Sequence, residues 1–151
     1  MALALLAPIC ASVGCAHAAE PLPPCSAPEP LHVTVKAAPR LNLGERGDAL
    51  ATVVRLYQLK KVSKLEQASF DDVLDHDHDT LGEDFVSVQE VTVNPGERLA
   101  PALTRAADAT FLAAVALFRE PSGSSWRAFM KLPAPDPQHC HRAVSRDRDP
   151  Y

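Results

Sequence analysis

The sequence predicts an all-β protein, a compact β-sandwich with one short helix packed on an edge or an end. Apolar residues alternate with polar ones, or form short β-branched and aromatic runs, in several segments separated by turn residues. Only residues 68–77 carry apolar side chains at helical spacing. The 151 residues, 46% hydrophobic and 23% charged, have the normal composition of a single globular domain. We expect that domain to span residues 31–133.

The turn signals divide this span into short strands. They are expected at residues 31–37, 49–61, 83–97, 98–105, 110–120 and 126–132. Pro101 places the 98–105 strand at an edge or a bulge, because proline cannot donate a ladder hydrogen bond. The final strand is expected to place four apolar side chains on one side: Trp126, Ala128, Met130 and Leu132. Residues 120–125 are expected to form the turn of the last hairpin.

The helix is predicted at residues 68–77. Ser69 is its expected N-cap, and Phe70, Val73 and Leu74 form one apolar face. The segment 75–79, DHDHD, alternates carboxylates with imidazoles. In an extended loop such side chains could converge on a metal ion, but the spacing does not fit a calcium-binding loop. We interpret the segment instead as a solvated helix end followed by a loop.

The N-terminus has the character of a secretory signal. Residues 2–9 are apolar apart from one proline, and the run is too short for a transmembrane helix. Residues 12–15, Ser-Val-Gly-Cys, resemble a bacterial lipobox, in which the cysteine is lipidated and becomes the new N-terminus. The alternative is an ordinary cleavage near residues 16–19. We therefore expect a lipoprotein signal at 1–14, lipidation at Cys15 and a proline-rich tether over 15–30.

The central block carries a specific resemblance. Residues 54–59 read Val-Arg-Leu-Tyr-Gln-Leu, followed by the short helix with Phe70, by Leu81-Gly82, and by the Pro95-Gly96 turn. In this order, after a lipobox, these motifs resemble the TssJ family, the outer-membrane lipoproteins of the bacterial type VI secretion system. The resemblance covers residues 31–133.

Several expectations follow from the resemblance. It implies a transthyretin-like β-sandwich with one or two short helical insertions, tethered to the outer membrane and facing the periplasm. The residue after Cys15 is Ala16 and not aspartate, which in Gram-negative lipoproteins resembles the signal for sorting to the outer membrane. The implied partner is the periplasmic C-terminal domain of the inner-membrane protein TssM, and the covalent lipid on Cys15 is the only attached group expected.

In the family, the loop joining the first two strands contacts that partner, and the corresponding segment here is residues 39–48. Its expected partner-binding residues are Leu41, Asn42, Leu43, Gly44, Glu45, Arg46 and Gly47. Apolar residues flanked by mixed charges match the anatomy of a modest protein interface. The alternative is that Leu41 and Leu43 fold back onto the sandwich as a cap.

Two cysteines remain once Cys10 leaves with the signal and Cys15 carries lipid. Cys25 and Cys140 lie near opposite ends of the mature chain, and in an oxidising compartment we expect them to form a disulfide. Two free thiols, or an intermolecular bond, are the alternatives. Residues 134–151 are expected to be a proline-rich C-terminal tail.

Other function classes receive little support from the sequence. A net charge of −4 argues against nucleic-acid binding. We find neither a phosphate-binding glycine loop nor a nucleophile elbow. We therefore expect that the protein is not an enzyme and that it has no metal site and no cofactor. The alternative function is a periplasmic protein that binds a metal or a small ligand.

Overall fold

A computed structural model describes residues 29–134, so Cys10, Cys15, Cys25 and Cys140 lie outside the described part of the chain. The strands are β1 (Pro30–His32), β2 (Val35–Lys36), β3 (Thr52–Leu59), β4 (Phe85–Val93), β5 (Arg98–Leu99), β6 (Ala102–Thr104), β7 (Phe111–Ala116) and β8 (Arg127–Lys131). The helices are α1 (Ser63–Gln67) and α2 (Phe70–Leu81), and a 3-10 turn follows at Gly82–Asp84.

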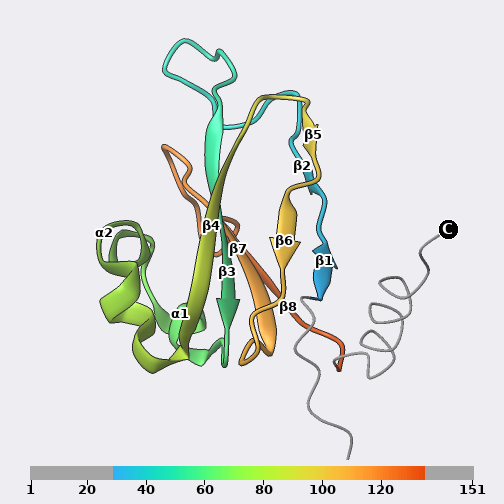
Figure 1. Ribbon diagram of the computed structural model, residues 1–151. Coiled ribbons are helices and arrows are strands. Elements are labelled where there is room, and N and C mark those ends of the chain that lie inside the picture. Colours follow the sequence, from blue (N-terminus) through green and yellow to red (C-terminus); the bar gives the residue numbers. More distant parts are fainter. Residues whose placement is uncertain (1–28, 135–151) are drawn as a thin grey trace, which may run out of the picture.

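The elements form a layered sandwich (Figure 1). The central layer is a four-stranded antiparallel sheet in the order β4-β3-β7-β8. The short pairs β1–β6 and β2–β5 cover one face of this sheet, and α1 and α2 cover the other. The predicted all-β sandwich is confirmed in an open form, with two short helices. The helices lie on a face of the sheet, and the expectation that a helix would pack on an edge or an end was wrong.

Strand β3 lies at the centre of the sheet, and its side chains alternate between the two faces. Val54 and Leu56 face the short strand pairs and belong to the apolar cluster between those layers. Tyr57 and Leu59 face the helices and are completely buried. Both faces of β3 are therefore buried, which explains why the segment is so rich in apolar and β-branched residues.

Helix α2 begins where the sequence predicted. The Ser69 hydroxyl accepts a hydrogen bond from the Asp72 amide at 3.1 Å, and the Asp72 carboxylate accepts one from the Ser69 amide at 3.3 Å, completing a capping box. The Ser69 hydroxyl also donates to the Asp72 carboxylate at 2.6 Å. This hydrogen bond and, secondarily, the one from the Ser69 amide lower the pKa of Asp72. The helix runs past residue 77 because Leu81, fully buried, anchors its last turn, and Gly82 ends it with a φ of +52°.

Helix α1 was not predicted, because its five residues carry a single buried side chain, Leu65, and no apolar period. Its stability comes from a partner distant in the sequence. The guanidinium of Arg127, on β8, donates hydrogen bonds to the backbone carbonyls of Leu65, Glu66 and Ala68. Helix α1 is thus fixed to the sheet through its free carbonyl groups.

The two strands of the outer layer are interrupted at matching positions. The expected strand 31–37 divides into β1 and β2, and the expected strand 98–105 divides into β5 and β6. His32 pairs with Ala102, and Val35 pairs with Leu99, so the break lies opposite Pro101. The missing amide of proline accounts for the local loss of pairing, as the sequence suggested.

The last strand, β8, differs from its prediction. Trp126 and Leu132 are buried, but they belong to clusters on opposite faces of the sheet. Met130 is 58% exposed and Ala128 is exposed too, because β8 is an edge strand. The four residues therefore do not form one buried side.

A polar contact fixes α2 to the sheet. The Tyr57 hydroxyl donates a hydrogen bond to the Asp77 carboxylate at 2.7 Å, and Arg55 lies 3.6 Å from the same carboxylate. Arg55 also donates to the carbonyls of Val73 and Leu74, both at 3.1 Å. Burial and the hydrogen bond to Asp77 raise the pKa of Tyr57. Arg55 and Tyr57 therefore both contact α2 from the sheet, and the Tyr57 hydroxyl lies under this helix.

We predict that Tyr57→Phe lowers the free energy of unfolding by about 1.5–2 kcal/mol, because it removes a hydrogen bond to a charged acceptor and leaves the ring in place. Chemical denaturation of the purified chain measures this change. In an Asp77→Asn background the same substitution should cost less, since the two residues act as a pair. Strictly additive effects would contradict the pairing.

Candidate functional site

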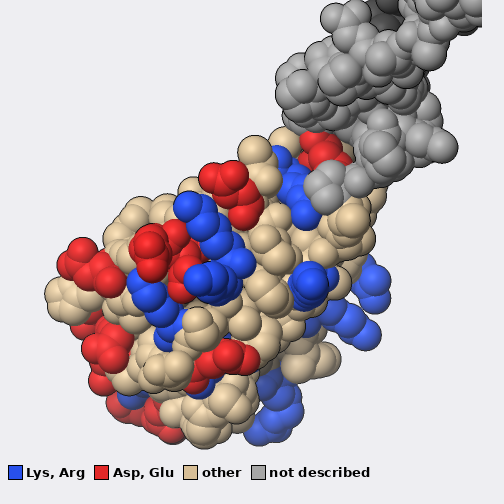
Figure 2. All heavy atoms as spheres, turned by 90° about the horizontal axis from the view of Figure 1, so that it is seen from below, with Lys and Arg blue, Asp and Glu red and all other residues tan. Residues whose placement is uncertain are grey.

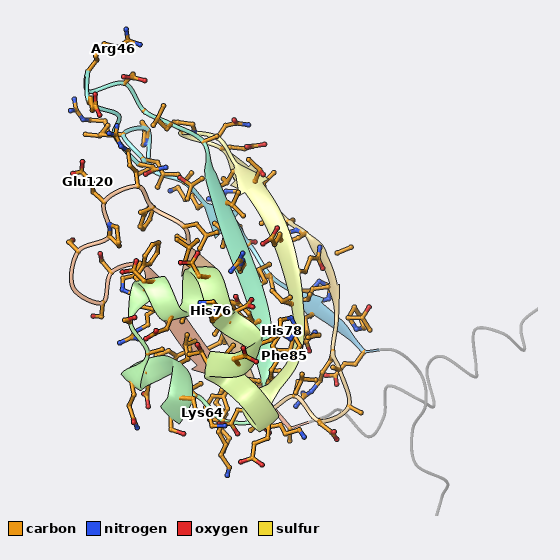
Figure 3. All side chains as sticks on the ribbon, turned by 90° about the vertical axis from the view of Figure 1, so that its left-hand side faces the viewer. Arg46, Lys64, His76, His78, Phe85 and Glu120 are labelled. Carbon is orange, nitrogen blue, oxygen red and sulfur yellow. The ribbon has the colours of Figure 1, made fainter. Side chains whose placement is uncertain are left out.

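The loop at residues 39–48 is a closed, ordered projection at one end of the sandwich (Figure 1). Leu43 and Ala49 form an isolated antiparallel bridge at its neck. The Gly47 amide donates to the Gly44 carbonyl at 2.9 Å, which closes a tight turn at the tip. Gly47 has a φ of +78°, a conformation that favours glycine. Arg46 lies at the outermost point of the loop (Figure 3).

The two leucines of this loop have different environments. Leu41 is partly buried and packs against the cluster that contains Val54 and Val93. Leu43 is 38% exposed. Leu41 therefore folds back onto the sandwich, as the alternative interpretation expected. Leu43 is the apolar side chain that remains available to a partner.

The loop contacts a second loop, residues 117–126, that joins β7 to β8. The Asn42 side-chain oxygen accepts a hydrogen bond from the Arg119 amide at 2.8 Å, and the Asn42 amide group donates to the Ala51 carbonyl at 3.3 Å. The Arg119 guanidinium forms an ion pair with Glu45. Sequence reasoning missed Arg119, because nothing near it in the chain signals a partner 77 residues away.

The DHDHD segment lies inside α2, which is kinked at His76 (φ −138°, ψ 38°). The expected break in the helix is therefore present close to residue 77, but the expected loop is wrong, because the chain continues as a further helical segment to Leu81. Successive side chains point around the helix, and of the five only Asp77 is partly buried, against β3. The His78 ring lies 4.1 Å from the Phe85 ring (Figure 3). Figure 2 shows acidic side chains gathered toward the helical side of the domain. Among residues 29–134, no three His, Cys, Asp or Glu side chains lie close enough to hold a metal ion.

A groove opens between the layers beside β8. It has a volume of about 340 Å³ and is lined by side chains of β3, β7 and β8 and by residues 33–35. Thr34 is the one polar residue of this lining. Small-ligand sites place several polar groups around an apolar pocket to orient the ligand. The groove lacks such a set, so the small-ligand alternative gains no support from it.

The two ends of the described chain are held side by side, at the end of the sandwich opposite the 39–48 loop (Figure 1). The Arg105 guanidinium donates to the Pro133 carbonyl at 2.6 Å and lies 3.6 Å from the Glu29 carboxylate. The Arg105 amide also donates to the Glu29 carbonyl at 2.8 Å. Between these two ends, neither helix is long and apolar enough to cross a bilayer.

The fold has counterparts among known proteins. The family model described as "Type VI secretion lipoprotein, VasD, EvfM, TssJ" matches residues 29–147, a longer span than the motifs at 31–133 covered. The crystal structure of the T6SS lipoprotein TssJ1 from Pseudomonas aeruginosa is 31% identical, with a TM-score of 0.65, and the match covers 71% of this chain and 82% of that one. A search of curated protein sequences finds no match.

Two further solved structures are similar. A chain of a structure described as "Type VI membrane complex" is 27% identical, with a TM-score of 0.65, and the match covers 72% of this chain and 85% of that one. A chain of the structure described as "T6SS protein TssM C-terminal domain (869–1107) from EAEC" is 25% identical, with a TM-score of 0.61 and coverage of 71% and 86%.

These likenesses define a lipoprotein component of the bacterial type VI secretion system. The chain belongs to the TssJ family of type VI secretion lipoproteins, as its motifs indicated.

The Arg105 contacts bear on the predicted Cys25–Cys140 disulfide. Cys25 lies four residues before Glu29, and Cys140 lies seven residues after Pro133. Extended chain covers at most about 14 Å and 25 Å over these lengths, so the two cysteines can meet at the distance of about 5.5–6 Å between Cα atoms that a disulfide needs.

We predict that the chain isolated from the periplasm contains this disulfide. Intact mass should rise by two hydrogens on reduction, and Cys25→Ser or Cys140→Ser should lower the free energy of unfolding by up to about 4–5 kcal/mol. Serine at Cys10 is the control and should change neither measurement. Two freely alkylated thiols in the oxidised preparation would contradict the disulfide.

Proposed function

We propose that the chain is an outer-membrane-anchored lipoprotein of the type VI secretion membrane complex, and that it binds the periplasmic C-terminal domain of TssM. The observation that carries the proposal is the exposed 39–48 loop, ordered by its own hydrogen bonds and presenting Leu43 and Arg46. An ordered loop loses little conformational entropy on binding, which favours affinity. The similarity to chains described with a type VI membrane complex and with the TssM C-terminal domain supports this choice of partner.

The position of the chain ends supports the anchor. The tether expected at residues 15–30 would join the sandwich beside Glu29, at the end remote from the 39–48 loop (Figure 1). A lipid on Cys15 would therefore hold the domain with its loop directed away from the outer membrane, toward a partner that reaches out from the inner membrane. The acyl chains contribute about 0.8 kcal/mol per buried CH₂ group, so several chains on one cysteine anchor firmly.

We predict that Cys15→Ser releases the protein from the membrane or leaves it unprocessed, because the thiol that carries the lipid is gone. Membrane fractionation and intact mass measure both outcomes. Ala16→Asp should keep the lipid but move the protein to the inner-membrane fraction. Cys10→Ser is the control and should fractionate as the wild type does. Unchanged outer-membrane fractionation of Cys15→Ser would rule out this anchor.

We predict that Leu43→Ser weakens binding to the periplasmic domain of TssM about tenfold or more, because it removes the exposed apolar side chain of the loop. Arg46→Glu should weaken binding about fivefold, chiefly through slower association. Calorimetry with the full chain in detergent measures both affinities.

Two variants serve as matched controls. Phe129 is 41% exposed, close to the value for Leu43, and lies on the edge strand β8. Lys61 is exposed and lies at the other end of β3 from the loop. Phe129→Ser and Lys61→Glu should leave the affinity unchanged. Full binding by folded Leu43→Ser and Arg46→Glu variants would place the interface elsewhere on the domain.

A further inference from the structure

The contacts between Asn42, Glu45 and Arg119 join two loops that are far apart in the sequence, and we call them the loop clamp. Asn42 has a φ of +48°, and asparagine tolerates this left-handed conformation better than other residues with a side chain. Its carboxamide accepts from the Arg119 amide and donates to the Ala51 carbonyl. One orientation of the carboxamide satisfies both partners, so Asn42 fixes the neck of the 39–48 loop on two sides.

The partner loop, residues 117–126, is itself firmly held. The Leu117 amide donates to the Val53 carbonyl of β3 at 2.9 Å. At the other end Trp126 is buried in the helix-side core, its indole nitrogen donating to the Gly123 carbonyl at 2.9 Å. The 117–126 loop is therefore anchored to the core at both ends, and the clamp joins the 39–48 loop to it.

We propose that Asn42 and Arg119 are positioning residues, which hold the 39–48 loop in the orientation that binds its partner. This inference rests on the proposed function, because it assumes that the loop is the binding site. The free chain would bind with an apparent Kd equal to the intrinsic Kd divided by the fraction of molecules whose loop is correctly oriented. If loss of the clamp reduces that fraction to about one tenth, the Kd rises about tenfold with no partner contact removed.

The first test uses two substitutions of Asn42. Asn42→Gly permits the positive φ but has no carboxamide, whereas Asn42→Asp keeps an oxygen that can accept from the Arg119 amide. We expect Asn42→Gly to raise the Kd for the TssM periplasmic domain about tenfold and to speed hydrogen exchange at the Arg119 amide. We expect its thermal unfolding midpoint to stay close to wild type. Asn42→Asp keeps the acceptor for the Arg119 amide but loses the donor to the Ala51 carbonyl, so we expect it to retain part of the affinity and protection.

The second test uses the ion pair. Glu45→Arg and Arg119→Glu should each weaken binding, and the double variant should recover, because it rebuilds the pair with its charges exchanged. A direct contact between Glu45 and the partner would leave the double variant as weak as Glu45→Arg, which would overturn a positioning role for this pair.

The outcomes separate the two proposals. If the wild-type chain binds and folded Asn42→Gly binds equally well, the positioning role is wrong and the proposed function stands. If Arg119 exchange is unprotected in the wild type, the clamp does not hold in solution and the inference fails. If the wild-type chain does not bind the TssM domain, the proposed function is wrong, and the positioning role falls with it.

Discussion

The two-sided burial of β3 is the constraint on which the rest of the structure depends. The strand pairs with β4 and β7 along its edges, and its side chains face the helices on one side and the short strand pairs on the other. Every layer of the domain therefore takes its position from the same eight residues. The polar side chains in the middle of this strand, Arg55, Tyr57 and Gln58, each have hydrogen-bond partners, whereas the buried Thr52 hydroxyl at its start has none.

That constraint explains the motif through which the family was first identified. Arg55 and Tyr57 point toward α2 and bind its carbonyls and Asp77. Gln58 points the other way, donating to the Thr104 carbonyl at 2.8 Å and accepting from the Ala106 amide at 2.8 Å. The polar residues of the motif thus form the hydrogen bonds that hold the layers on both sides of the central strand. The apolar residues of the motif pack in the cores between the layers.

The sequence predicted most strands and the start of α2, because alternation, turn residues and caps are local signals. It did not predict α1, whose carbonyls depend on Arg127, about 60 residues away. It also placed Trp126 and Met130 on one side of a last strand, whereas Trp126 precedes β8 and packs in the helix-side core. The loop residues 41–47 were chosen from the family resemblance, and their contact with Arg119 could not be predicted, because it joins residues 77 positions apart.

The path from the chain end at Glu29 to the 39–48 loop runs only through β1 and β2. A pull between these two points would pass along the covalent backbone of β1 and β2, while the β1–β6 and β2–β5 ladders keep this segment attached to the domain. The large sheet and the helices lie beside this path and would carry little of the tension. The shortest strands of the domain therefore form its mechanical link, and the sandwich core can stay intact while force passes along its side.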